Sequence, residues 1–240
     1  MKKIFLLLGG LAIYQTAYYM LRSTTALPSA DQLMLSLWDS FSKRDIYLDI
    51  FASLSRVLVG VTLATIVGVA LGLVLSHFKP FSFLTFYIEL LKPIPPIAWI
   101  PIAIILFGLG DTSSYFIVFL GSFFPIFSST YFGANSIPTI HKNSALSFEM
   151  TKKKYFQKIL FPYSLPFIIN GVKIGIGMGW MSVIAAELIG AQSGLGYFIQ
   201  FSRLLLQTDK VIVGMLAIGI IGYGLQKCIE HLENKIVRWR

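Results

Sequence analysis

The chain has 240 residues, of which 55% are hydrophobic and 13% are charged, and its formal net charge is +9. Soluble domains carry about 25% charged residues, so this composition excludes a soluble fold, a disordered chain and a collagen-like chain. The single cysteine, Cys228, excludes an internal disulfide, and the three histidines have no partners at the spacing of a metal site or a catalytic triad. The sequence therefore predicts an all-α integral membrane protein that is not an enzyme.

Stretches without Asp, Glu, Lys or Arg predict the membrane spans, because a helix needs about 20 apolar residues to cross the hydrocarbon core. About six spans are expected, near residues 4–21, 57–78, 93–110, 115–134, 167–187 and 211–225. The first stretch is longer than the apolar core of about 7 to 15 residues in a signal peptide, and Arg22 follows it. We therefore expect an uncleaved first span.

The basic residues near the span ends indicate the orientation. With the N-terminus inside, thirteen lysines and arginines lie on the inner side and five on the outer side. Since cytoplasmic loops retain positive residues, both termini are predicted to be cytoplasmic. The net charge of +9 is thus mostly positive charge on the cytoplasmic side of the membrane. A nucleic-acid partner would require a soluble basic face, and the sequence shows none, so no nucleic-acid partner is expected.

The third predicted span begins with the proline-rich segment Lys92–Pro101. Each proline removes a backbone donor and disfavours helical geometry in the preceding residue, so residues 89–97 are expected to be bent or unwound. Pro95, Pro96 and Trp99 are therefore candidates for a kinked pathway or gating helix. A proline-capped helix start is the simpler alternative.

The fifth predicted span is rich in glycine. Gly171, Gly175 and Gly179 are spaced four residues apart, and small residues at this spacing let helix backbones approach closely within a membrane. We expect these three glycines to pack against a neighbouring helix.

The same span carries Lys173, Trp180 and Glu187, which are further pathway candidates because ionisable groups at membrane depth are commonly functional. Lys173 and Glu187 are fourteen residues apart, about 21 Å along a helix, so they cannot pair with each other. Glu187 is thus nearly alone among the charges of the spans. Glu187 could contact the substrate. The two alternatives are that it lies at the outer membrane interface or that it bonds to a neighbouring helix.

The longest predicted cytoplasmic loop covers residues 135–164. Ala145 and Tyr155 belong to an apolar pattern of three- and four-residue spacing, which predicts two short helices that end at Pro162. The run Lys152–Lys154 gives the loop a basic side. This loop is a candidate docking element, and ordinary positive charge near lipid phosphates is the alternative.

The order of motifs resembles the permease subunits of ABC importers of the nitrate, sulfonate and taurine class. The motifs are Leu27-Pro-Ser-Ala, Leu91–Pro101, Phe107-Gly-Leu-Gly110, Ala185-Ala-Glu-Leu-Ile-Gly190, Ser193-Gly-Leu-Gly-Tyr197 and Arg238-Trp-Arg240. The resemblance implies a type I importer fold in the bacterial cytoplasmic (inner) membrane. Residues 1–47 are then expected to hold the first span and an extracytoplasmic segment, residues 48–234 the permease core, and residues 235–240 a cytoplasmic tail.

The resemblance also implies partners. In such importers two permease copies, here expected as a homodimer, form the pathway, a cytoplasmic ABC ATPase binds the loop helices, and an extracytoplasmic binding protein delivers the solute. ATP and magnesium belong to the ATPase, and no cofactor is expected on this chain, which lacks a Gly-Lys pair and hence a phosphate-binding loop. The residues expected to couple to the ATPase are Asn143, Ser144, Ala145, Phe148, Glu149, Lys152, Lys153, Lys154 and Tyr155.

The loop departs from the family pattern, which has Glu-Ala-Ala, a glycine six residues after the first position, and a closing Leu-Pro. With Phe161-Pro162 at the closing pair, Asn143-Ser144-Ala145 takes the first three positions and Glu149 takes the glycine position. Glycine there ends a helix with a backbone freedom that Glu149 lacks. The turn is therefore expected to be built differently, or the loop helix to continue.

The motifs around Ala185 and Ser193 are most similar to the sulfonate and taurine members, so an aliphatic sulfonate or a related small anion is the expected solute. Nitrate, bicarbonate and a thiamine-precursor pyrimidine are alternatives within the family. A secondary transporter or channel is a more distant alternative, because such carriers usually place repeated acids and histidines at mid-membrane, and the two halves here show no evident repeat.

Overall fold

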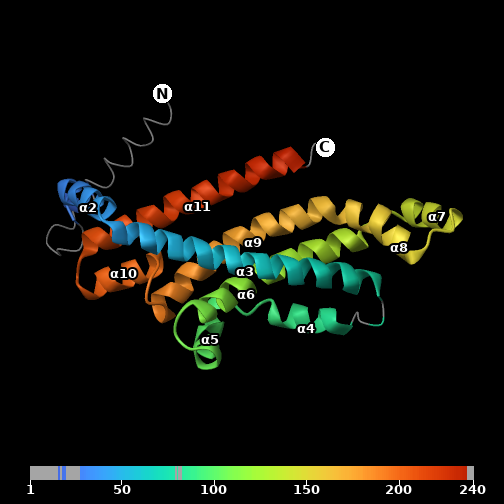
Figure 1. The fold of residues 1–240 in the computed structure, drawn as a ribbon, viewed down its shortest axis with the longest axis horizontal. Coiled ribbons are helices and arrows are strands. Elements are labelled where there is room, and N and C mark those ends of the chain that lie inside the picture. Colours follow the sequence, from blue (N-terminus) through green and yellow to red (C-terminus); the bar gives the residue numbers. More distant parts are fainter. Residues whose placement is uncertain (1–15, 17, 20–27, 79, 81–82, 237–240) are drawn as a thin grey trace.

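The fold is described from a computed structural model, which covers residues 16, 18–19, 28–78, 80 and 83–236 (Figure 1). These residues form helices and turns, with no strand among them, which confirms the all-α prediction. The helices are α2 (Ala30–Ser42), α3 (Arg44–His77), α4 (Phe83–Leu91), the 3₁₀ helix η3 (Pro96–Trp99), α5 (Ile100–Phe107), α6 (Asp111–Asn135), α7 (Thr139–Ser147), α8 (Lys152–Tyr155), the π-helical turn η4 (Phe156–Leu160), α9 (Phe161–Gly190), α10 (Leu195–Leu204) and α11 (Thr208–Ile236).

Within the described ranges, four helical segments are long and apolar enough to cross a membrane, namely residues 44–77, 111–135, 152–190 and 208–231. The bent pair of α4 with η3 and α5 makes up to five if it is counted as one crossing. Apart from residues 16, 18 and 19, the first predicted span lies outside the described residues, and so do residues 237–240 of the predicted tail. Helix α3 begins at Arg44, so no break in structure falls at the expected boundary between residues 47 and 48.

Helix α6 lies between α3 and α9 and forms the centre of the fold. Along α3, a Cβ atom added to Gly60, Gly68 or Gly72 would meet side chains of α6 at 2.5–3.1 Å, so the two backbones approach closely only because of these glycines. On the other side of α6, the hydroxyl of Ser122 donates to the Gly175 carbonyl of α9 at 2.9 Å. The hydroxyl of Ser129 donates to the Phe167 carbonyl at 2.7 Å.

The third span differs from the prediction of one helix at residues 93–110. The chain instead forms α4, a break at residues 92–95, and then η3 and α5, with a bend of 92° between the two parts. Pro93, Pro95 and Pro96 account for the break, because each lacks an N–H donor and restricts the residue before it. The expected bend within residues 89–97 is confirmed, whereas α5, with 8 residues, is too short to cross alone.

The loop helices do not end at Pro162 as predicted, nor does the fifth span begin near residue 167. Helices α8, η4 and α9 follow one another without a break, so residues 152–190 form one helical segment of 39 residues. Local π-helical geometry lets a helix continue where a proline removes a donor, and η4 ends at Leu160, two residues before Pro162. The basic loop segment and the glycine-rich span are therefore one element.

The two ends of the helix bundle differ. Helices α2 and α10 and the start of α11 gather at one end, and α7 and α8 extend from the opposite end (Figure 1). Helix α10 has no counterpart in the sequence prediction, which took residues 188–210 as a connection. We refer to the two ends as the α2 end and the α7 end.

Candidate functional site

A buried ion pair lies near the α2 end and joins α3 to α9. Arg56 Nη1 lies 2.7 Å from Glu187 Oε1, and the two side chains are 3% and 0% exposed. Arg56 Nη2 also lies 2.7 Å from Asp111 Oδ1 at the start of α6. The pair thus connects the first turn of α6 with the interiors of α3 and α9.

The turn before α10 is held by the same polar groups. Arg56 donates to the Ser193 carbonyl at 2.7 Å and to its hydroxyl at 2.8 Å. Glu187 accepts from the Gly196 N–H at 2.9 Å, and Ser53 bridges Glu187 and the Leu195 N–H at 2.9 Å each. The Ser-Gly-Leu-Gly motif therefore supplies backbone donors and acceptors to a buried charge pair.

Glycine is required in this turn. Gly194 has φ +107°, and a Cβ atom there would lie 2.4 Å from the Glu187 carboxylate. Its N–H donates to Asp49 Oδ1 at 2.7 Å. A Cβ atom at Gly196 would lie 2.7 Å from the Ile184 carbonyl, so a larger residue at either position would push the turn away from α9.

The prediction that Glu187 is nearly alone is wrong. Ser53 and Arg56, which pair with it, lie more than 130 positions earlier in the chain. Glu187 is 1% exposed, so it presents no surface to a passing solute. In the structure Glu187 instead bonds to the neighbouring helix α3, which was the alternative to a substrate contact.

Helix α7 ends at the position where the family pattern has glycine. Glu149 has φ +45°, its N–H donates to the Leu146 carbonyl at 2.9 Å, and the Met150 N–H donates to the Ala145 carbonyl at 3.0 Å. This is the Schellman arrangement that normally uses glycine in the left-handed conformation. The turn therefore keeps the geometry of a glycine turn with a glutamate in it, and the loop helix does not continue.

The predicted loop residues are only partly brought together. Ala145, Lys152 and Tyr155 line a cavity of ≈ 270 Å³, and His77 from the end of α3 stacks on the Tyr155 ring at a centroid distance of 6.0 Å. The other predicted residues are exposed on the surface of the loop; they are Asn143, Ser144, Phe148, Glu149, Lys153 and Lys154.

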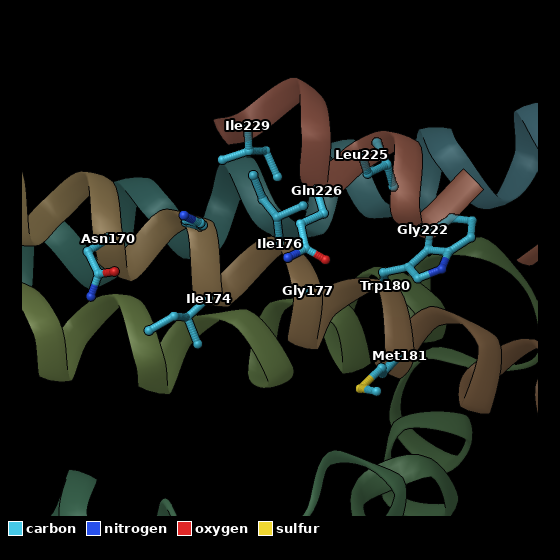
Figure 2. Close-up of a pocket in the computed structure, with 11 residues that line it drawn as sticks. Asn170, Ile174, Ile176, Gly177, Trp180, Met181, Gly222, Leu225, Gln226 and Ile229 are labelled. Atoms are coloured by element: carbon cyan, nitrogen blue, oxygen red, sulfur yellow. The ribbon is translucent and has the colours of Figure 1, made fainter. Parts of the chain in front are cut away.

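Lys173 and Trp180 line a cavity of ≈ 420 Å³ between α9 and α11 (Figure 2). Trp180 crosses to α11, where its Nε1 donates to the Ile218 carbonyl at 3.3 Å. Asn170 and Gln226 also line this cavity and were not predicted. Gln226 lies on α11 and shares no sequence spacing with the α9 residues. Asn170 lies on α9 but is uncharged, so it does not stand out in the sequence as an ionisable residue within a span does.

Gly171, Gly175 and Gly179 all face α6 or α3. An added Cβ atom would lie 2.9 Å from the Ser129 Cβ at Gly171, 2.8 Å from the Ile126 side chain at Gly175, and 2.5 Å from the Ser122 hydroxyl at Gly179. Gly177, in contrast, has nothing within 4 Å of such an atom.

Pro95, Pro96 and Trp99 lie at the bend between α4 and α5, apart from the α9–α11 cavity. Pro96 begins η3, and Trp99 ends it. The Trp99 Nε1 is buried without a hydrogen-bond partner. These residues are therefore grouped with the bend and not with Lys173 and Trp180.

The sequence matches the family described as binding-protein-dependent transport system inner membrane component over residues 60–233. It is 35% identical over 191 residues to the nitrate import permease protein NrtB of Synechocystis sp., with 79% of this chain and 70% of that protein covered. It is 29% identical to the taurine transport system permease protein TauC of Escherichia coli, with 99% and 90% covered. Its fold is similar to a chain of the MetNI methionine ABC transporter in an inward-facing conformation, with a TM-score of 0.68 at 18% identity, over 81% of this chain and 95% of that one.

Proposed function

Since this chain belongs to the family of binding-protein-dependent transport system inner membrane components, we propose that it is the permease subunit that forms the solute pathway of an ATP-driven importer. The observation that carries the proposal is the family match over residues 60–233, which includes everything from the middle of α3 to most of α11. Family membership itself makes the chain a membrane component of an ABC importer. The pathway, its solute and its contact with the ATPase are the proposed part.

The α7 end is proposed to face the cytoplasm and to bind the ATPase. Support comes from the Schellman turn at Glu149, which ends α7 in the register expected for a coupling helix. Phe148 is 76% exposed beside this turn, and Lys152–Lys154 follow it at the start of the next helix. An exposed aromatic ring beside Glu149 suits a partner groove that has an apolar pocket for the ring, acidic groups for the lysines and a basic residue facing Glu149.

The solute is proposed to be a small anion, with an aliphatic sulfonate or taurine as the first candidate. The similarity to TauC over 99% of this chain supports this choice, and the higher identity to NrtB keeps nitrate as the second candidate. A second copy of the chain is proposed to complete the pathway, and an extracytoplasmic binding protein to deliver the solute.

Reconstitution tests the proposal. The chain is placed in proteoliposomes with its ATPase and binding protein, and ATP hydrolysis is measured with taurine, ethanesulfonate, nitrate, bicarbonate or a thiamine-precursor pyrimidine. One of these solutes is expected to stimulate hydrolysis and to accumulate in an ATP-dependent manner. Accumulation that continues without ATP would identify a secondary transporter and overturn the proposal.

Contact with the ATPase is tested separately by Glu149→Lys, with Glu149→Gln as the matched control. Both variants keep a side chain in the same left-handed turn, but only the lysine reverses its charge. Co-purification with the ATPase is expected to fall strongly for Glu149→Lys and little for Glu149→Gln. Equal recovery of the ATPase with both variants and the natural chain would remove Glu149 from the interface.

A further inference from the structure

We propose that the cavity at the α7 end binds a phosphate group, which Lys142 and Lys152 hold with His77 beside them. An anionic lipid headgroup and a free phosphate both offer this chemistry, and the experiment separates the two sources. The site is independent of the solute that the importer carries.

Three parts of the chain meet at this cavity of ≈ 270 Å³. His77 is the last residue of α3, Lys142 lies on α7, and Lys152 is the first residue of α8. The cationic side chains therefore converge on one hollow through the tertiary structure, and not because they are neighbours in the sequence.

The positive charge around the cavity is not neutralised by acidic residues of the loop. Residues 136–160 contain five lysines and one acidic residue, Glu149, which does not line the cavity. In the described part of the chain, the ion pairs involve other cations, and neither Lys142 nor Lys152 belongs to one. Because like charges repel each other, an anion between the two lysines would relieve their repulsion.

The lining suits a phosphate that carries an organic part. Each lysine offers three N–H donors, and the His77 ring offers at least one in either protonation state. Lysine commonly binds phosphate as a point charge. Leu146 and Met150 add apolar surface to the same hollow. Basic pockets between helices on the cytoplasmic side of a membrane typically bind anionic headgroups of this kind.

One wall of the cavity is fixed, whereas the other is loosely attached. The His77 ring stacks on Tyr155 at a centroid distance of 6.0 Å and meets the Phe78 ring edge-on at 4.9 Å. Helix α7 has no extensive packing with any other described helix, and it lies at the far tip of the bundle (Figure 1). A phosphate group between Lys142 and Lys152 would therefore hold α7 against α8 and the end of α3.

Lys153 and Lys154 provide a matched control. They follow Lys152 directly and are exposed, as Lys142 and Lys152 are, but they do not line the cavity. A diffuse attraction between the loop and anionic surfaces depends on the number of basic residues, so it weakens equally when either pair is removed. A site in the cavity depends on Lys142 and Lys152 alone.

The experiment uses the full chain, purified in a neutral detergent. In the first arm, the unfolding temperature is measured with inorganic phosphate and with chloride at equal ionic strength, since a ligand of the folded state raises this temperature. In the second arm, the chain is extracted from vesicles of phosphatidylcholine and phosphatidylglycerol in equal parts, and mass spectrometry identifies the lipid that it retains. A rise with phosphate identifies a free anion as the ligand, and selective retention of phosphatidylglycerol identifies a headgroup.

The double variant Lys142→Gln with Lys152→Gln is expected to weaken this binding at least about tenfold, because two charge-assisted contacts are lost. The double variant Lys153→Gln with Lys154→Gln is expected to stay within about twofold of the natural chain. Equal weakening by both double variants indicates diffuse attraction only and overturns the inference.

An absence of binding in both arms also overturns it. Should the first double variant fail to fold, Lys142→Gln alone decides, since an unaltered affinity in that variant contradicts the site. Each of these measurements uses the chain without its ATPase or binding protein. The proposed function is therefore unaffected by their outcome and is decided by the transport assay.

Discussion

Arg56 is a fully paired cation within the helix bundle. A guanidinium has five N–H donors, and the structure provides contacts for them at Glu187, Asp111 and both oxygens of Ser193. A buried charge pair of this kind adds little net stability compared with apolar residues, but the removal of one partner leaves an uncompensated charge. Its main effect is to fix how α3, α6, α9 and the turn before α10 are arranged.

Glu187→Gln is expected to lower the free energy of unfolding by about 1–3 kcal/mol, because the buried guanidinium loses one charged partner and keeps Asp111 as the other. Thermal unfolding in detergent micelles measures the effect. The control is Lys43→Ala, which removes the exposed Lys43–Asp39 pair and is expected to cost at most about 1 kcal/mol. If the two variants unfold at the same temperature, the pair does not hold these helices together.

Glu149 adopts the left-handed conformation at a local cost, since a Cβ atom costs about 1–2 kcal/mol there. Glu149→Gly is therefore expected to stabilise the turn by about 1 kcal/mol, and Glu149→Val to destabilise it. Hydrogen exchange at the Met150 amide, which donates to Ala145, reports the change. Slower exchange in the valine variant than in the glycine variant would contradict the left-handed turn.

The packing of α9 against α6 depends on which face of α9 each glycine occupies. Gly171→Ala places a methyl group 2.9 Å from the Ser129 Cβ, so it is expected to cost about 1–3 kcal/mol of unfolding free energy. Gly177→Ala meets no atom within 4 Å and is expected to stabilise the helix slightly, because alanine favours a helix over glycine. The unfolding temperatures of the two variants are compared in the same detergent, and a larger loss for Gly177→Ala would reverse the assigned faces.

The orientation of the molecule can be measured with cysteine labels. In a Cys228→Ser background, Ser42→Cys lies at the α2 end and Asn143→Cys at the α7 end, and both positions are exposed. A maleimide that cannot cross membranes is expected to label residue 42 in intact cells and residue 143 only after permeabilisation, as the distribution of basic residues predicts. The opposite pattern would place the coupling loop outside and exclude an ATPase contact there.

The sequence was sufficient to predict the spans that follow from continuous hydropathy, such as α6 and α11, and the bend that follows from Pro93, Pro95 and Pro96. It was insufficient wherever the decisive contact is distant in the chain. Arg56 and Glu187 are 131 residues apart, so neither one indicates the other. Helix α10 is amphipathic and short, and its start depends on Gly194 bonding to Asp49, which no local pattern encodes.

The continuity of residues 152–190 has a mechanical consequence. Lys152 in the basic loop and Lys173 in the cavity wall belong to one continuous helical segment. A displacement of the loop along the axis of this segment would therefore move the cavity wall by the same distance. The exception is η4, where the π-helical turn contains one residue more than an α-helical turn would hold. Conversion of that turn to regular α-helix would rotate α9 by about 100° about its own axis relative to α8 and would turn Lys173 away from α11.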